Sequence, residues 1–317
     1  PENGDFYLQD GSPAIGASQD GLDMGYTFGG TGASCTNCIY VSEAGNGDGS
    51  QLSPFGSIQT AIDAASEGDT ILVLVGEYTE NLTIEKSIVL TSNYMFDNNP
   101  FSIETTIIDG GSPSDPNFGS TIFISPPYEG FTTQPEVTGF TIRNGNGTMI
   151  TNYIGTTITD EDAYTQVVGG GIFVYNCQPN LHDNYFIENG LNIYTSDIID
   201  EGGAVYISVG EYLEFTDGSL FSPYTGPYIP TRDEISLQGC RFTGNLADYG
   251  NSIVTHGFSG TVNTQNCFFD VFSSDASSVS SYWVAGDDEV EYDFTGSSGD
   301  AEAITIPDIH INEDSGD

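Results

Sequence analysis

Four segments of this 317-residue chain share one spacing, with an anchor residue, a second landmark three residues on and a large apolar residue five residues on. The anchors are Val137, Leu181, Leu237 and Thr264. The second landmarks are Phe140, Asn184, Cys240 and Cys267, and the third are Ile142, Phe186, Phe242 and Phe269. The intervals between anchors are unequal. The pattern therefore predicts stacked coils of similar cross-section, with loops of different length inserted, and equal landmarks lying in ladders.

Short strand-like runs separated by turn residues occupy most of the chain. Ile71–Val75 is a continuous apolar run, as expected for a strand buried on both faces. The glycines at 169–171 and 202–203 precede equivalent strands. One helix is expected over 58–65, where apolar residues recur at helical spacing, with Gly68 as its stop. An inward Asn184 must place its amide hydrogen bonds on the backbone or on a neighbouring coil.

The charge balance excludes several partners. The chain carries 46 acidic and 4 basic residues, for a formal net charge of -42. Nucleic-acid binding requires clustered Lys and Arg, so nucleic acid and anionic membranes are excluded as partners. No stretch approaches 18 consecutive apolar residues, so no membrane insertion is expected.

The stretch 40–90, YVSEAGNGDGSQLSPFGSIQTAIDAASEGDTILVLVGEYTENLTIEKSIVL, resembles the entry of right-handed parallel β-helix proteins of the pectate-lyase-like superfamily. VTGFTIRNG, GGGIFVYNCQPNLHDNYFIENG, GGAVYIS and SLQGCRFTGN resemble its coils. The resemblance covers roughly residues 38–272. It implies an all-β solenoid with a short N-terminal capping helix, and it implies no particular activity, because this fold hosts many functions.

Three regions are expected. Residues 1–34 form an extended N-terminal strap, 35–284 the β-helix and 285–317 an acidic tail that breaks the coil pattern. Residues 5–26 resemble an element that in this family usually follows the last coil. Either β-helix modules stand in tandem in the parent protein, or the strap closes the last coil of a neighbouring subunit and produces head-to-tail polymers.

Cysteines and sequons favour an extracellular protein. Cys35-x-x-Cys38 could be a metal half-site, a redox pair or a disulfide, and we favour disulfide bonding, either locally or to another chain. Cys240 and Cys267 are expected to pack as buried apolar groups. Asn81 and Asn146 are glycosylation candidates. The chain begins at Pro1 without a signal peptide, which favours a mature or excised product.

No catalytic cluster is readable, and we assign neither catalytic nor cofactor-binding residues. Lyases of this superfamily use a Lys or Arg base, but Arg143 and Arg241 lie inside coil strands, where a structural role is expected. The related hydrolases need paired carboxylates, but acidic pairs such as Asp200/Glu201 are expected by chance in a chain this acidic and do not indicate a catalytic site. His182 follows an inward anchor and should face outward. The sequence leaves open whether the chain is an enzyme, and it favours a role without catalysis.

Calcium is the one cofactor worth considering. Candidate oxygen ligands in polar turns are Asp48, Asp109, Asp160 and Asp162, with solvated turn carboxylates as the alternative.

We therefore predict an extracellular structural β-helix that self-associates through residues 1–34 into a filament or surface layer. The alternative is a polysaccharide-binding module, or a polysaccharide lyase or hydrolase of the β-helix superfamily. Tyr212, Tyr224 and Tyr228 in the insert 208–234 could bind sugar or a partner, or could cover a sheet face.

Overall fold

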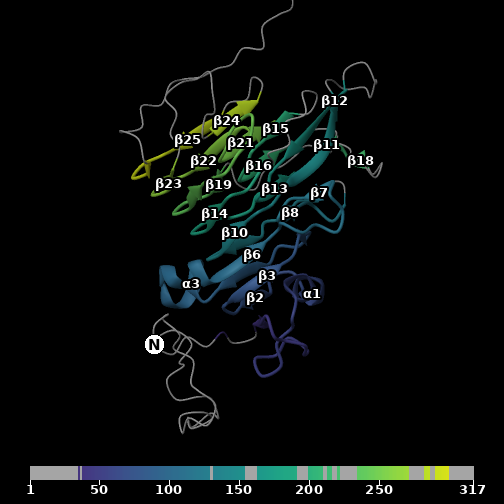
Figure 1. Ribbon diagram of the computed structural model, residues 1–317, viewed down its shortest axis with the longest axis vertical. Coiled ribbons are helices and arrows are strands. Elements are labelled where there is room, and N and C mark those ends of the chain that lie inside the picture. Colours follow the sequence, from purple (N-terminus) through teal and green to yellow (C-terminus); the bar gives the residue numbers. More distant parts are fainter. Residues whose placement is uncertain are drawn as a thin grey trace, which may run out of the picture.

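The chain folds into a right-handed parallel β-helix with three sheets along its length, seen side-on in the computed structural model (Figure 1). The structure describes residues 35, 38–128, 131–153, 163–190, 199–209, 213–215, 220–221, 234–270, 282–285 and 290–299. Successive strands pass from sheet 1 to sheet 2 to sheet 3 and return one coil further along, in parallel register. This confirms the predicted fold class.

Each sheet is a ladder of short strands. Sheet 1 contains β1 (Ile39–Val41), β2 (Thr70–Val73), β5 (Val89–Ser92), β9 (Glu136–Thr138), a bridge at Asn180, β19 (Glu234–Ser236), β22 (Gly260–Asn263) and β25 (Val290–Asp293). Sheet 2 contains β3 (Gly76–Thr79), β6 (Thr106–Asp109), β10 (Thr141–Arg143), β14 (Tyr185–Ile187), β20 (Arg241–Thr243), β23 (Phe268–Phe269) and β26 (Ser298–Gly299). Sheet 3 contains β4 (Leu82–Ile84), β8 (Ile122–Ile124), β13 (Ile172–Tyr175), β16 (Val205–Ser208), β21 (Ile253–His256) and β24 (Tyr282–Ala285).

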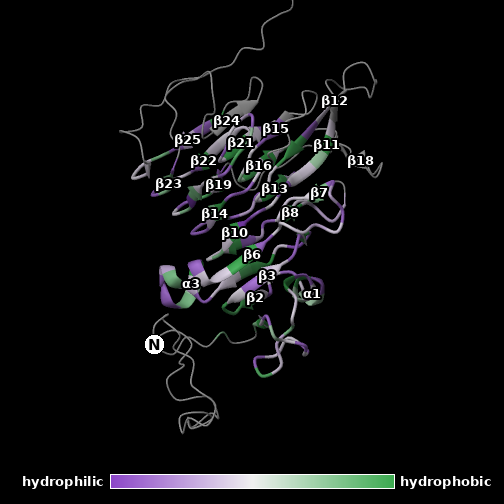
Figure 2. Cartoon of the chain, viewed as in Figure 1, coloured by the Kyte–Doolittle hydropathy of each residue, from purple (hydrophilic) through white to green (hydrophobic). Residues whose placement is uncertain are grey.

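The predicted landmarks stack as expected. Ile142 pairs with Phe186, Phe186 with Phe242, and Phe242 with Phe269. The Phe186 and Phe242 rings lie parallel with centroids 5.1 Å apart, and those of Phe242 and Phe269 are 4.8 Å apart. Asn184 is buried; its Nδ2 donates to the Val137 carbonyl and its Oδ1 accepts from the Phe140 N–H. Hydrophobic residues lie along the strands and hydrophilic ones are frequent at the turns (Figure 2).

A cover sheet lies over the outer face of sheet 3. It contains β7 (Phe118–Gly119), β11 (Gly147–Tyr153), β12 (Ala163–Val168), β15 (Ile199–Glu201), β17 (Leu213–Phe215) and β18 (Leu220–Phe221). Phe173 and Tyr206 point outward from sheet 3, yet both are buried in a cluster with Ile150 and Val168 of the cover sheet. These insertions explain the unequal coil lengths. β17 and β18 belong to the insert 208–234, whose Tyr212, Tyr224 and Tyr228 lie outside the described residues.

Three short helices lie among the first coils. α1 (Ile58–Ala64) packs Ile58, Ala61 and Ile62 into the core and caps the N-terminal end, while α2 (Tyr94–Asp97) and α3 (Pro100–Thr105) precede β6. The helix predicted over 58–65 is confirmed, but it ends at Ala64 and not at Gly68. The ammonium group of Lys86 caps its last carbonyls, so the helix ends before the glycine is reached.

The coils continue past the expected boundary at residue 285. β25 pairs with β22, and β26 pairs with β23. Residues 290–299 are therefore part of the ladders, although the acidic composition of the tail suggested a break. The expected strap 1–34 and residues 301–317 lie outside the described residues.

Candidate functional site: a polar groove on the outer face of sheet 1

Two rows of polar side chains follow the outer face of sheet 1 along the solenoid axis. The anchors point inward, so the residues immediately before and after each anchor point outward. The row before the anchors is Glu136, Asn180, Ser236 and Asn263, and Asp293, in register with Asn263, continues it. The row after them is Thr138, His182, Gln238 and Gln265. Neighbouring strands lie about 4.8 Å apart, so the polar groups of each row follow one another at about this interval along the solenoid axis.

An open groove of about 530 Å³ lies over these rows. It is lined by Pro179, Asn180, Glu234, Ser236, Gln238, Thr261 and Asn263. Asn263 Nδ2 donates to Glu234 Oε1 at 2.9 Å, which orients one amide of the lining. The lining thus presents amides, hydroxyl groups and one carboxylate, the groups that form hydrogen bonds with hydroxylated ligands.

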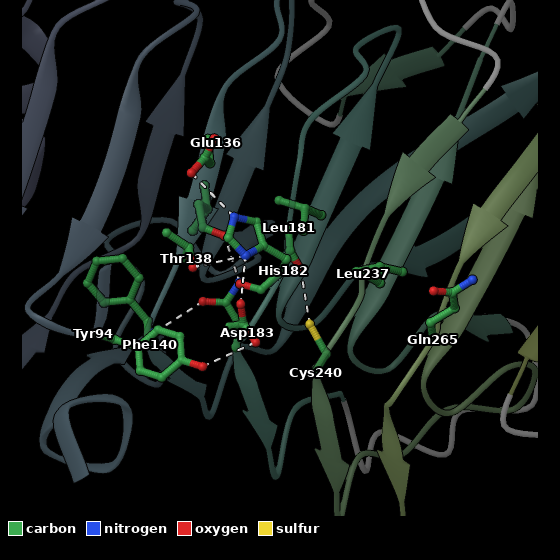
Figure 3. Close-up of polar contacts among 12 residues, drawn as sticks. Tyr94, Glu136, Thr138, Phe140, Leu181, His182, Asp183, Leu237, Cys240 and Gln265 are labelled. Carbon is green, nitrogen blue, oxygen red and sulfur yellow. Dashed lines mark hydrogen bonds and ion pairs between the residues drawn. The ribbon is translucent and has the colours of Figure 1, made fainter. Parts of the chain in front are cut away.

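A charged cluster lies around His182, two residues after Asn180 of the groove lining (Figure 3). His182 Nδ1 lies 2.8 Å from Asp183 Oδ2, and its Nε2 lies 3.3 Å from Glu136 Oε1. Tyr94 Oη lies 3.4 Å from Asp183 Oδ1. Asp183 occupies a coil corner with φ of 54°, where the equivalent residues of adjoining coils are Gly139 and Gly239, also with positive φ. This corner turns the Asp183 carboxylate back toward the imidazole.

The two carboxylates control the protonation of His182. Hydrogen bonds to Asp183 and Glu136 raise the pKa of His182 to about 9, although partial burial acts in the opposite direction. The ring is therefore an imidazolium at neutral pH, and each ring nitrogen donates to a carboxylate. An imidazolium has no lone pair to accept a proton, so at pH 7 His182 positions and neutralises Asp183 and Glu136. The outward direction predicted for His182 is confirmed.

The structure describes two of the four candidate calcium ligands, Asp48 and Asp109, and each forms hydrogen bonds of its own. Asp109 Oδ2 accepts from Arg143 Nε and Asn144 Nδ2, both at 2.8 Å, and Oδ1 accepts from the Gly111 N–H. Burial raises the pKa of Asp109, but these hydrogen bonds outweigh it and leave the pKa below its usual value. Asp48 is exposed and accepts from the Ser50 N–H. Within the described ranges, no group of three or more His, Cys, Asp or Glu side chains could hold a metal ion.

Asp160 and Asp162 lie outside the described residues. Cys35 and Cys38 form a disulfide, whereas Cys240 and Cys267 are free and buried. Arg143 also pairs with Glu77 at 2.7 Å, and Arg241 lies over the Phe268 ring. Both arginines are therefore held in structural contacts on sheet 2.

The two sequons differ in their surroundings. Asn81 Nδ2 donates to the carbonyl oxygens of Gly110 and Ser120, at 3.2 and 3.0 Å. Its amide therefore holds adjoining coils together. Asn146 uses its backbone N–H to bond the Gly119 carbonyl and is half-buried.

Sequence reasoning missed the two polar rows, although a signal for them exists. Glu136, Asn180, Ser236 and Gln238 stand next to the anchors that define the coils. Reading the residues before and after every anchor would have placed them on one face.

Comparisons with known proteins give a family and a set of similar folds. The family described as "Protein of unknown function (DUF1565)" matches residues 41–223. No curated protein matches the chain by sequence. No helix within the described part of the chain has the length and apolar character needed to span a bilayer.

Pectin methylesterases stand among the similar solved structures. Pectin methylesterase PemA from Erwinia chrysanthemi is 18% identical, with a TM-score of 0.43 over 85% of this chain and 68% of that one. The enzyme from Aspergillus niger in its deglycosylated form is 14% identical, with a TM-score of 0.33 over 86% and 88%. The GH136 lacto-N-biosidase from Eubacterium ramulus is 14% identical, with a TM-score of 0.32 over 73% and 34%.

Proposed function

Because this chain belongs to the family described as "Protein of unknown function (DUF1565)", which assigns no activity, we propose a function from its geometry. The chain is an extracellular β-helix module that binds an uncharged polysaccharide along the outer face of sheet 1. The observation that carries this proposal is the groove of about 530 Å³ lined by amides and hydroxyl groups.

The regular spacing of the rows favours a polymer over a single sugar. Asn180, Ser236 and Asn263 recur at one-coil intervals along the axis. An extended polysaccharide also presents hydroxyl groups at regular intervals. Each coil can therefore bind one part of the same chain in an equivalent way.

The charge of the groove favours an uncharged ligand. Glu234 lines the groove, Glu136 and Asp293 extend its row, and the whole chain carries a formal net charge of -42. The nearby cation His182 is already paired with two carboxylates. A polyuronate would therefore meet electrostatic repulsion along its length.

The disulfide between Cys35 and Cys38 supports an extracellular location, since such bonds persist in oxidising compartments. Secretion of the chain is part of the proposal.

Isothermal titration against soluble xylan, mannan and β-glucan, with polygalacturonate as the charged comparison, tests the ligand class. We expect at least one uncharged polymer to bind and polygalacturonate not to bind. Gln238→Ala removes an exposed groove amide and should weaken binding roughly fivefold to tenfold, the worth of about one hydrogen bond. Gln51→Ala removes an exposed amide outside the groove and should leave affinity unchanged. Tighter binding of polygalacturonate, or equal effects of the two variants, would contradict the proposal.

Head-to-tail self-association is a second candidate. The described ladders end at β24, β25 and β26, whose outer edges have no further partner strand within the described residues. Such edges are templates for pairing with another chain. Deleting residues 1–34 should abolish filaments in electron micrographs of concentrated protein. Dispersed rods from the intact chain, or filaments that persist after the deletion, would reject this candidate.

A further inference from the structure

A second acidic site lies at the corner where β15 meets the segment 247–250, away from the groove. The Asp200 carbonyl oxygen accepts hydrogen bonds from the N–H groups of Asp248 and Tyr249, at 3.0 and 3.1 Å. Asp248 Oδ2 in turn accepts from the Asp200 N–H at 3.2 Å. These three bonds fasten β15 to the next coil.

Asp200 is buried, and one oxygen of its carboxyl group has no hydrogen-bond partner among the described residues. The residue is 7% exposed, and within the described part of the chain Oδ1 has no hydrogen-bond partner. Burial and the charge of Asp248 raise the pKa of Asp200 to about 6. Ionisation would leave an unsatisfied charge beside a second carboxylate, which is costly in a low-dielectric site.

Among the described residues of the neighbouring elements, none supplies a balancing positive charge. On β12 the residue in register with Asp200 is Val167, and on β15 the side chain of Glu201 points to the opposite face. The following coil contributes Asp248. The described lysine and arginines are bound elsewhere: Lys86 to α1, Arg143 to Asp109, and Arg241 against Phe268. A proton is therefore the available counter-charge among these groups.

We propose that Asp200 and Asp248 form a proton-operated latch between β15 and the segment 247–250. A proton taken from solvent onto the Asp200 carboxyl closes the latch, because the neutral acid neither repels Asp248 nor leaves a buried charge. Loss of that proton sets two carboxylates against each other and weakens the three hydrogen bonds that join the coils, two between backbone groups and one from the Asp200 N–H to the Asp248 carboxylate. Because β15 pairs with β12, the latch also fixes one edge of the cover sheet.

The direction of the pH dependence follows from the folded and unfolded pKa values. The pKa of Asp200 is higher in the folded chain than its ordinary value of 3.8. The closed state is therefore favoured fully below about pH 4 and loses this advantage as the pH rises through about 6. The opening equilibrium of the latch should change by up to roughly 100-fold across that range.

Hydrogen exchange of the intact chain between pH 4.5 and 7.5, corrected for intrinsic rates, tests the latch. We expect protection of the Asp248 and Tyr249 amides to fall as the pH rises through 6. Asp200→Asn, a neutral analogue of the closed form, should keep these amides protected throughout. Asp248→Asn removes the like charge that helps to raise the pKa of Asp200, so the loss of protection should become smaller and its midpoint should move to lower pH. Asp115→Asn, at an exposed turn carboxylate, should reproduce the wild type.

Protection that is independent of pH in the wild type would overturn the latch. So would equal pH dependence in the wild type and Asp200→Asn. The alternative is that the corner binds a cation, and a repeat of the series with calcium chloride tests it. If calcium restores protection at pH 7.5 while protons have no effect between pH 5 and 7, the corner is a cation site and the proposal is wrong.

Discussion

The ammonium nitrogen of Lys86 lies 2.8 Å from the carbonyl oxygen of Ala65, just beyond the end of α1. It also donates to the carbonyls of Ile62 and Asp63, each at 2.9 Å. At the other end of α1, the Glu80 carboxylate accepts from the N–H groups of Ile58 and Gln59. One charged side chain at each end therefore fastens a seven-residue helix that is too short to be stable alone.

Lys86→Met should lower the free energy of unfolding by about 1.5–3 kcal/mol, because two carbonyls of α1 and that of Ala65 lose a charged donor. Urea unfolding followed by circular dichroism measures the change. Glu85→Gln alters an exposed neighbouring charge and should stay within about 0.5 kcal/mol of the wild type. Equal stability of Lys86→Met and the wild type would show that core packing alone holds α1.

Phe242→Ala should destabilise the chain by about 3–5 kcal/mol, because Phe242 lies between Phe186 and Phe269 in the buried stack. Phe242→Leu fills part of the space and should cost less. The control is Phe101→Ala on α3, where the side chain is 61% exposed, and little change is expected. Thermal unfolding of the three variants gives the order of their stabilities. A smaller loss of stability in Phe242→Ala than in Phe101→Ala would contradict this prediction.

Asn81→Ala should cost about 1–3 kcal/mol in unfolding free energy, since the carbonyls of Gly110 and Ser120 lose their shared donor. Thr83→Ala removes the same sequon but keeps the amide, and its side chain is exposed. If Asn81 serves the fold, only the first variant is destabilised in urea. Equal stability of the two variants would show that the Asn81 amide does not stabilise the fold, and Asn81 would remain a glycosylation candidate only.

His182 should contribute a pH-dependent increment of stability. Its pKa is raised to about 9 from an ordinary 6.5, so the folded state holds the proton more tightly. The increment is therefore fully present below about pH 6.5 and is lost as the pH rises through about 9. One pKa unit corresponds to about 1.4 kcal/mol; because the side chain is 27% exposed, solvent screening leaves roughly 1–2 kcal/mol.

His182→Gln should remove that increment and flatten the difference between unfolding free energies at pH 6 and pH 9.5. A proton NMR titration of the imidazole checks the protonation directly, with the variant used for assignment. A midpoint near 6.5 would mean that Asp183 and Glu136 do not hold the ring.

The core of the fold could be predicted from the sequence because its signal is local. Each coil repeats an inward anchor and a large apolar residue at fixed spacing, and burial alone demands both. The position of Phe186 above Ile142 followed directly from that spacing. The end of α1 could not be predicted, because its cap comes from Lys86, which lies far beyond the helix in sequence.

The groove on sheet 1 could not be predicted for a different reason. Asn180 and Gln238, read singly, are ordinary solvent-facing strand residues, and only the register of the coils brings them together. The same holds for Asp200, one carboxylate among 46 acidic residues, whose burial depends on the next coil. Loop lengths vary along the chain, so the anchor spacing predicts which landmarks stack but does not predict the burial of a residue outside the landmarks, such as Asp200.

The parallel ladders also give this molecule a directional mechanical response. Hydrogen bonds between coils, such as those joining β16 to β21, run along the solenoid axis. Tension applied to the two ends therefore loads these bonds in series, and the weakest junction yields first while the others hold. A stretched chain should extend in discrete steps at low force. Those steps should differ in length, since each released coil carries its own insertion.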